Sequence, residues 1–289
     1  MKTKFNQAIN IALFLIVCCL YFAIFSYLSV KTEVLFLPVG EGDSELIKTK
    51  AGNLLIDAGP KNYVLNSLSA ALPFYDKVLD VVIISHPDAD HFNGLLYLLD
   101  YYKIRVVVLN NFGSQNGSYL ELLRLIHNKN IPIVLGVKGT EIQLGNQKER
   151  CKIIYPESSD LATIKNDNDF SIINTFETPY GNFLFTGDAA AKSLEKISKE
   201  ISDKKFIALK VPHHGAKKTL SRNIITNLHW DYSIIEVGKN SYNHPTQEIL
   251  SLLQEADIPI LRTDLDGLIK FQESRGDFIL RKLQHPLFK

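Results

Sequence analysis

The sequence predicts a layered α/β domain in which helices flank two β-sheets, and three observations support this expectation. From residue 34 onward, short apolar runs follow one another with turn residues between them, a pattern typical of successive strands. Runs of strand length then alternate with stretches of helical spacing, as in layered α/β proteins. A second β-rich half repeats this order, and no repeat or Pro/Gly/Ser-rich linker divides residues 32–289, which we expect to form one domain.

The first half opens with strands that are separated by turn residues at 40–43. The apolar run that follows is short enough for a buried strand, and apolar residues three and four apart then predict helices. In chain order we expect strands at 34–37, 45–47, 53–56 and 81–84, a helix at 93–102, a strand at 104–109, a helix at 119–127 and a strand at 131–135.

The second half carries the same kinds of pattern. Residues 264–267, Asp-Leu-Asp-Gly, are expected to form a hairpin turn rather than a metal site. In chain order we expect strands at 153–155, 171–176 and 182–185, a helix at 189–201, strands at 206–211 and 232–237, a helix at 246–256, and strands at 258–261, 268–271 and 278–280.

Residues 1–31 differ from the rest and are expected to form a membrane anchor or a signal segment. Lys2 and Lys4 precede a charge-free run at 5–30, whose apolar part has about the ~20 residues that a membrane helix needs. Basic residues before the run favour a cytoplasmic N-terminus and an exported domain. The run lacks a small-residue cleavage site, so we expect one uncleaved transmembrane helix rather than a removed signal peptide.

Composition limits the partners and the redox chemistry. The chain has 32 Lys and Arg against 31 Asp and Glu, a net charge of +1, so any binding of a polyanion must be local. Cys18 and Cys19 lie in the apolar run and leave Cys151 alone in the folded part. A disulfide framework is therefore excluded there.

Polar side chains cluster directly after the strand at 81–84. His86-Pro-Asp88-Ala-Asp90-His91 places two imidazoles and two carboxylates within six residues. Both groups bind divalent metals, and alternate residues of an extended loop project to the same side. His86 and Asp88 can then share one ion while Asp90 and His91 serve a second. The alternative is a solvated loop in which an Asp caps the next helix.

Two later strands also end in candidate ligands. Thr-Gly-Asp188 follows one apolar strand, and Pro-His213-His214-Gly follows the next. Alone, Asp188 would be read as the cap of a following helix. Beside the first cluster, we expect Asp188 to bridge two ions and a His after the following strand to complete the second site.

With these residues in this order, the chain resembles the metallo-β-lactamase superfamily, and within it the extracellular hydrolase domain of the ComEC/Rec2 family. The resemblance covers nearly all of residues 34–273 and implies a four-layered αβ/βα fold with a two-metal site at the sheet edges. The matching segments are Val-Gly-Glu-Gly-Asp at 39–43, Leu-Ile-Asp-Ala-Gly at 55–59, His-Pro-Asp-Ala-Asp-His at 86–91, Asn-Asp-Phe-Ser at 168–171, Thr-Gly-Asp at 186–188, Leu-Lys-Val-Pro-His-His-Gly at 209–215, Tyr-Asn-His-Pro at 242–245 and Thr-Asp-Leu-Asp-Gly at 263–267.

The resemblance assigns roles residue by residue. Six residues match metal ligands: His86 and Asp88 for the first ion, Asp90, His91 and His214 for the second, and Asp188 as the bridge. Asp90 and Asp188 are also expected to serve catalysis. Asp57 matches an acidic residue of the superfamily that orients the metal loop, and it could have a structural role or participate directly. Asp43 is expected to have a structural role near the site.

Two departures from the superfamily pattern bear on the metal. Asp88 stands where many members carry His, and Asn168 lies where another His is often found. An oxygen-rich ligand set shifts preference from zinc toward a harder ion such as manganese. We therefore expect two divalent ions, Zn²⁺ or Mn²⁺.

A two-metal site suits hydrolysis of a phosphodiester by metal-activated water. Lys210, His213 and Asn168 are expected to contact substrate, and His213 to stabilise developing charge. His244 is expected to donate a proton to the leaving oxygen or to hold a phosphate. A basic rim is expected from Lys217, Lys218, Arg222 and Lys239, whose alternative interpretation is ordinary surface residues.

Three functions follow from this reading. The first is a membrane-anchored nuclease or phosphodiesterase that acts on DNA outside the cytoplasm, alongside a separate DNA-uptake channel, since one apolar segment cannot form a channel. The second is a hydrolase of small substrates such as phosphorylcholine esters, lactones or β-lactams. The third is a non-catalytic, metal-stabilised binding module of the cell envelope.

Overall fold

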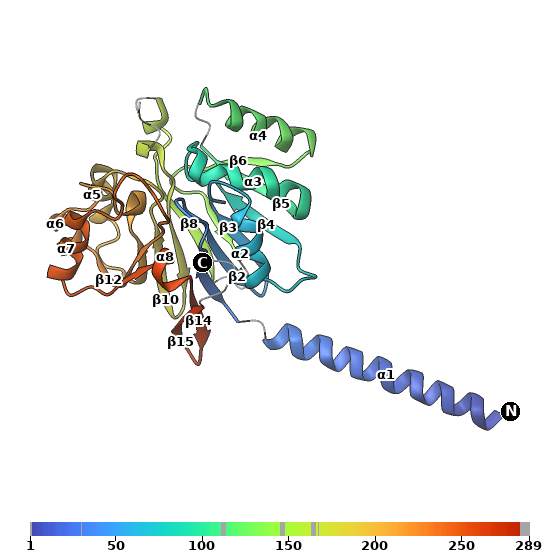
Figure 1. The fold of residues 1–289 in the computed structure, drawn as a ribbon. Helices are drawn as coiled ribbons and strands as arrows, with labels where there is room; N and C mark the ends of the chain where they lie inside the picture. The colour runs from blue at the N-terminus through green and yellow to red at the C-terminus, as the bar shows by residue number, and fades with distance from the viewer. Residues whose placement is uncertain are drawn as a thin grey trace.

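The computed structural model describes residues 2–29, 31–110, 114–144, 148–162, 166 and 168–283, and these form the two stacked sheets that the sequence predicts (Figure 1). Helices cover the outer face of each sheet, so the layers run helix, sheet, sheet, helix. The four-layered αβ/βα fold is thereby confirmed. Residues 1 and 30 of the expected N-terminal segment and residues 284–289 of the expected domain lie outside the described residues.

The first sheet mixes antiparallel and parallel pairing. Its strands from β3 to β6 run parallel, whereas β1, β2, β14 and β15 pair with their neighbours in antiparallel fashion. The order across the sheet is β15 (Asp277–Leu283), β14 (Leu268–Ser274), β1 (Glu33–Phe36), β2 (Glu45–Thr49), β3 (Gly52–Ile56), β4 (Val78–Ile83), β5 (Lys103–Leu109) and β6 (Ile133–Leu135).

The second sheet repeats this mixture. Its strands from β10 to β13 run parallel, and β7 to β10 pair in antiparallel fashion. The order is β13 (Ile260–Arg262), β12 (His229–Ile235), β11 (Lys205–Lys210), β10 (Gly181–Phe185), β9 (Ile173–Thr178), β8 (Arg150–Tyr155) and β7 (Glu141–Gln143).

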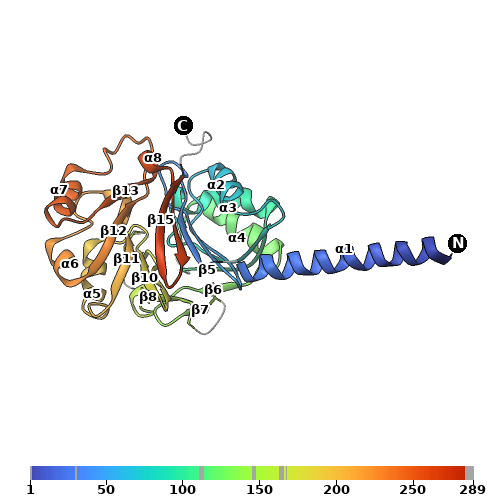
Figure 2. The same ribbon diagram turned by 90° about the horizontal axis from the view of Figure 1, so that it is seen from below.

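The helices pack on opposite sides of the stacked sheets (Figure 2). α2 (Tyr63–Ala71), α3 (Ala89–Tyr101) and α4 (Gly117–Asn128) bury their apolar faces on the first sheet. α5 (Ala191–Ser198), α6 (Arg222–Asn227) and α7 (Gln247–Glu255) do so on the second. The short helical segments are α8 (Thr263–Asp266), η1 (Asp160–Ala162), η2 (Asn168–Phe170) and η3 (Pro212–Gly215).

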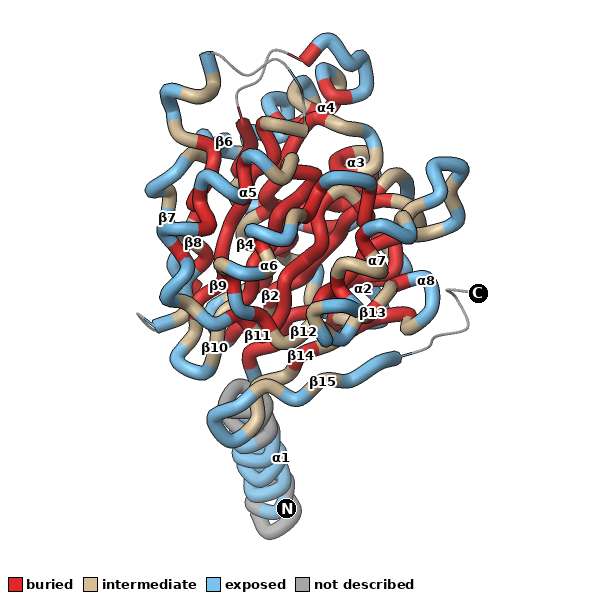
Figure 3. The backbone as a smooth tube through the Cα atoms, turned by 90° about the vertical axis from the view of Figure 1, so that its left-hand side faces the viewer, coloured by how far each residue is buried: buried red, intermediate tan, exposed pale blue. Residues whose placement is uncertain are grey.

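An apolar core fills the space between the sheets, where the buried strands run side by side (Figure 3). Aromatic rings from both sheets meet there: Phe36 lies 5.9 Å from Phe185, and Phe183 lies 5.5 Å from Phe271 in a T-shaped contact, both between ring centroids. Burial of such rings is the main favourable term in folding. The core fixes the sheets face to face and so fixes which strand ends meet.

The helix α1 (Lys2–Ser29) projects away from the layered body in both ribbon views (Figures 1 and 2). Across the described part of the chain, no helix combines the length and the apolar character that crossing a bilayer requires. The transmembrane helix expected at residues 5–30 is therefore not supported by the structure.

The prediction of a hairpin turn at residues 264–267 is wrong. β13 belongs to the second sheet and β14 to the first, so the connection crosses between sheets and cannot join paired neighbours. It forms the helical turn α8, which ends at Gly267 with φ of 70°. The Asp266 carboxylate accepts a hydrogen bond from the Arg262 N–H at 2.9 Å and closes this turn.

Candidate metal centre

The candidate metal centre lies where parallel strands of both sheets end. β3 and β4 of the first sheet lead to Asp57 and His86, and β10 and β11 of the second lead to Asp188 and His214. Ligand sites in α/β sheets commonly lie beyond the carboxyl ends of the strands. The inter-sheet core brings these four ends together.

Asp188 occupies the middle of the cluster. Its Oδ1 lies 3.3 Å from His91 Nε2, and its Oδ2 lies 3.9 Å from His86 Nε2 and 3.8 Å from His214 Nε2. A single carboxylate thus faces three imidazoles, which lie in segments that follow strands of two different sheets.

Two of these imidazoles each face a second carboxylate. His86 Nε2 lies 3.4 Å from Asp88 Oδ2, and His214 Nε2 lies 3.3 Å from Asp90 Oδ2. Asp188 lies between these two pairs. The structure therefore brings together all six residues that the sequence predicts as metal ligands.

The donor set fits divalent cations. Nε2 of His86, His91 and His214 and Oδ1 of Asp188 are buried without a hydrogen-bond partner among the described residues. Unpaired buried polar atoms are costly, and imidazole nitrogens with carboxylate oxygens are ordinary ligands of divalent metals. Ligand atoms of His86, His91 and Asp188 lie within 4.8 Å of one another, and the same holds for Asp90, His91 and His214.

The opposite nitrogen of each imidazole is held from behind. His91 Nδ1 lies 2.7 Å from Asp57 Oδ2, His214 Nδ1 lies 2.8 Å from the Glu236 carbonyl oxygen, and His86 Nδ1 lies 2.9 Å from the Ser85 hydroxyl. A carboxylate or carbonyl partner at Nδ1 leaves Nε2 directed at the metal, as is usual for His ligands.

Charges in the cluster pair with one another when no cation is present. Burial lowers the pKa of His91 and His214, but the nearby Asp188 and Asp43 carboxylates outweigh it and raise both pKa values well above the usual value. Burial raises the pKa of Asp188, yet His91 and His214 hold it well below its usual value. A divalent cation here would replace protons as the positive charge.

Lys210 has a different place from the one expected. Its side chain is fully buried, forms an ion pair with Asp43, and donates to the Gly187 carbonyl oxygen at 2.8 Å. Its Nζ also lies 3.7 Å from Asp188 Oδ1. This burial argues against direct contact between Lys210 and substrate. The Lys210 ammonium group instead lies beside the buried carboxylates of Asp43 and Asp188.

His213 and Asn168 lie together on the open side of the cluster. The Asn168 amide lies 3.1 Å from His213 Nδ1, and His213 Nε2 lies 3.6 Å from Asp188 Oδ2. An amide N–H can only donate, so it leaves Nδ1 as acceptor and the proton on Nε2. The N–H of His213 therefore faces the space above Asp188, where substrate would bind.

His244 lies beside His213, with 5.6 Å between the ring centroids, and its Nδ1 lies 3.4 Å from Glu41 Oε1. Burial, with the neighbouring His213 and His214, lowers the pKa of His244. The role expected for His244, to protonate the leaving oxygen or to hold a phosphate, stays a prediction.

The expected basic rim is only partly available. Lys217 Nζ lies 3.6 Å from Glu248, and Arg222 bonds Glu255 at 2.5 Å. Both cations are therefore balanced by acids on α7. Lys239 has no ion pair among the described residues and remains open to a phosphate.

Three supporting residues could not be predicted as such. Glu41 contacts His244, Glu236 accepts from His214 through its carbonyl, and Ser171 accepts from the Asp188 N–H at 3.0 Å. Glu41 and Ser171 lie in segments that resemble the family, while the signal for Glu236 was a carboxylate at the end of the apolar strand β12. Such a residue is expected to be exposed, whereas Glu236 is fully buried.

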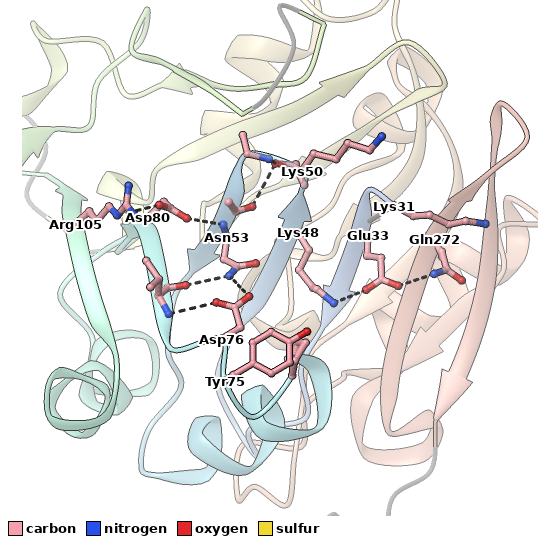
Figure 4. Close-up of a pocket in the computed structure, with 15 residues that line it drawn as sticks. Lys31, Glu33, Lys48, Lys50, Asn53, Tyr75, Asp76, Asp80, Arg105 and Gln272 are labelled. Atoms are coloured by element: carbon pink, nitrogen blue, oxygen red, sulfur yellow. Dashed lines mark hydrogen bonds and ion pairs between the residues drawn. The ribbon is translucent and has the colours of Figure 1, made fainter. Parts of the chain in front are cut away.

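A separate pocket of about 530 Å³ opens at another part of the first sheet (Figure 4). Several of its charges pair with one another: Lys48 lies 2.8 Å from Glu33, and Arg105 lies 3.2 Å from Asp80. None of the predicted metal ligands lines it. This pocket is therefore separate from the candidate metal centre around Asp188.

Comparison with known families gives a match over residues 37–226, to the family described as the metallo-β-lactamase superfamily. Among solved structures, the metallo-β-lactamase fold protein YhfI from Bacillus subtilis superposes with a TM-score of 0.55 and covers 81% of this chain and 96% of its own. The identity is 11%, so this likeness concerns the fold alone.

Curated relatives confirm the resemblance to competence proteins. ComE operon protein 3 of Bacillus subtilis is 29% identical over 279 residues, which cover 89% of this chain and 35% of that protein. Competence protein ComA of Neisseria gonorrhoeae is 25% identical over 253 residues, covering 85% of this chain and 33% of that protein. The chain therefore spans about a third of the length of these relatives.

Proposed function

The chain belongs to the metallo-β-lactamase superfamily, and from this premise we propose that it is a metal-dependent phosphodiesterase that cleaves DNA. The single observation that carries the proposal is the pair of ligand groups that share Asp188, one with His86 and Asp88 and the other with Asp90, His91 and His214. Two adjacent divalent ions are the common device for displacement at phosphorus.

Bound divalent ions supply Lewis acidity, which activates water and neutralises charge on a phosphoryl group. The chain's own residues supply position and hydrogen bonds. Asp188 stays ionised and aligns three imidazoles, and the His213 N–H donates to a phosphoryl oxygen above it. His244 lies next to His213, where it can protonate the leaving oxygen or hold a phosphate.

DNA is proposed as substrate because the relatives include a competence protein. The ligand set does not choose between zinc and manganese by itself, since carboxylates favour harder ions and imidazoles favour zinc. Both metals therefore belong in the assay.

The test uses the purified chain with linear single-stranded and double-stranded DNA in Zn²⁺ or Mn²⁺. We expect cleavage with at least one metal and loss of cleavage in Asp188→Ala. Asp203→Ala, at an exposed position after α5, serves as the matched control and should keep full activity. Hydrolysis of a small phosphodiester without cleavage of either DNA would replace the nuclease with a small-ester hydrolase, and no hydrolysis with bound metal would favour the binding module.

Location outside the cytoplasm is a separate proposal that rests on the sequence alone. Two lysines followed by an apolar, charge-free run are typical of segments that direct export. A fusion of an export-dependent reporter to the C-terminus would test it. Activity of the reporter supports export, and inactivity at normal fusion levels rejects it.

A further inference from the structure

We propose that a cavity beside the metal centre is a nucleotide-binding subsite, in which Tyr63 stacks on a base and Lys61 and Lys239 hold phosphates. This inference rests on the proposed nuclease function and names where the strand lies as it leaves the reacting phosphate. The subsite would bind single-stranded polynucleotide without reading its sequence.

The cavity has a volume of about 770 Å³, within the range of pockets that hold small ligands. Loops that follow β1, β3 and β12, the start of α2, and α8 form its walls. Its lining includes Gly40, Glu41, Lys61, Tyr63, Lys239 and Asp264.

Glu41 joins the cavity to the metal centre. It lines the cavity, and its Oε1 lies 3.4 Å from Nδ1 of His244. The next residue, Gly42, packs so closely on the Asp90 backbone that an added Cβ would lie 2.3 Å from the Asp90 carbonyl oxygen. Glu41 and the backbone of Gly42 thus lie between the cavity and the residues of the metal centre.

Tyr63 presents an aromatic face in this cavity. It is the first residue of α2 and keeps 47% of its surface exposed. Its ring lies over Gly40, where an added Cβ would lie 3.7 Å from two ring carbons. The backbone supports one side of the ring, and the exposed surface suits stacking of a base. Every nucleotide has a base that can stack, so such a contact does not depend on the sequence.

The charges of the cavity favour an anion. Lys61 and Lys239 are exposed and have no ion pair among the described residues. Asp264 pairs with Arg262 at 2.6 Å, and Glu41 accepts the Gly238 N–H at 2.9 Å, so two lysines face one acid that no cation balances in the described part of the chain. The positive charges are therefore the ones left for a phosphate backbone.

Binding, measured apart from cleavage, tests the subsite. The background is Asp188→Asn, which blocks cleavage, and the probe is a fluorescein-labelled single-stranded oligonucleotide followed by anisotropy. In this background, Tyr63→Ala should weaken binding about tenfold because one stacked base is lost, whereas Tyr63→Phe should keep the affinity. The matched control is Tyr180→Ala, since Tyr180 is 48% exposed and lies in the turn that precedes β10, at the opposite end from the metal centre.

The lysines are tested by salt dependence. Lys61→Gln with Lys239→Gln should reduce the slope of log affinity against log salt by about 1.4, or ~0.7 for each phosphate contact with a single strand. Lys103→Gln, at an exposed position at the start of β5, should leave the slope unchanged. An oligonucleotide carrying 5-iodouracil should also crosslink to Tyr63 on irradiation.

The outcomes separate this inference from the function on which it rests. Equal affinities for Tyr63→Ala and Tyr180→Ala, or no binding by the background protein, would overturn the subsite even if the wild type cuts DNA. Stacking at Tyr63 without cleavage by the wild type in either metal would support the subsite and reject the nuclease.

Discussion

Each metal-facing imidazole depends on a partner that holds its other nitrogen. The sequence indicates the ligands because four of them fall within six residues, but the partners of Nδ1 come from separate segments: the Asp57 carboxylate, the Ser85 hydroxyl and the Glu236 carbonyl oxygen. A backbone carbonyl leaves no mark in a sequence. Only Asp57 was predicted, because it belongs to a segment that resembles the family.

Asp57 offers the sharpest test of such support. Its backbone has φ of 54°, a conformation that Asn tolerates and Ala does not, so Asp57→Asn removes the charge without straining the loop. We expect metal affinity to fall about 10- to 100-fold, since His91 loses its anionic partner. Competition with a chelator measures this fall, and an unchanged affinity would show that Asp57 does not orient His91.

Glu236 gives a prediction in pH. Burial, and then the nearby Asp43, raise the pKa of Glu236 to about 8 from 4.5. Between these two pH values the folded state holds a proton on Glu236 that the unfolded state has lost. The contribution of Glu236 to the free energy of unfolding therefore falls as pH rises. In Glu236→Gln this loss is absent.

We measure the free energy of unfolding with urea, in the presence of EDTA, at pH 5, 6, 7 and 8. The value for Glu236→Gln should increase relative to the value for the wild type as pH rises. The exposed Glu255→Gln is the control and should follow the wild type at every pH. Parallel curves for Glu236→Gln and the wild type would show that Glu236 is ionised throughout.

At the scale of the element, α3 shows what sequence patterns can and cannot specify. Its apolar spacing predicted a helix, and its start at the end of β4 places His91 in its first turn. The spacing says nothing of how close the helix approaches its neighbours. Gly94 explains the approach: an added Cβ would lie 1.8 Å from the Ala58 carbonyl oxygen and 3.0 Å from that of Lys61.

Gly94→Ala should therefore destabilise the protein by about 1–3 kcal/mol, because α3 must move away from the loop that carries Asp57. Gly117→Ala is the matched control, since Gly117 also lies in a helix and an added Cβ there meets nothing within 4 Å. It should be neutral or stabilise by about 0.5–1 kcal/mol. Chemical unfolding measures both, and equal stabilities would contradict the close approach of α3.

Elements that escaped prediction are short or set by tertiary contacts. α6 has six residues and β7 has three, too few for a periodic pattern to be clear. α2 follows Asn62, a residue type that is common at helix starts and in loops alike, and its side chain makes no capping hydrogen bond. The Asp-Leu-Asp-Gly turn was misread because the sequence does not say that its two strands belong to different sheets.

At the scale of the whole molecule, the ligands recur at strand ends in an order that two stacked sheets explain. That order, more than composition, predicted the fold, since a net charge of +1 indicates neither a metal nor a polyanion. It could not predict that Lys210 is buried, because a lysine is ordinarily expected at the surface. Its burial follows from the acids around it, which lie in β2, in the loop before β2, and directly after β10 and β12.

The central claim is that the cluster around Asp188 holds two divalent ions. Metal analysis of the purified chain after equilibration with Zn²⁺ or Mn²⁺ and removal of free metal tests it most directly. We predict two ions per wild-type chain with at least one of these metals, two for Asp203→Ala, and fewer than two for Asp188→Ala, which loses the shared carboxylate. A wild-type chain that retains fewer than two ions with either metal would contradict the claim.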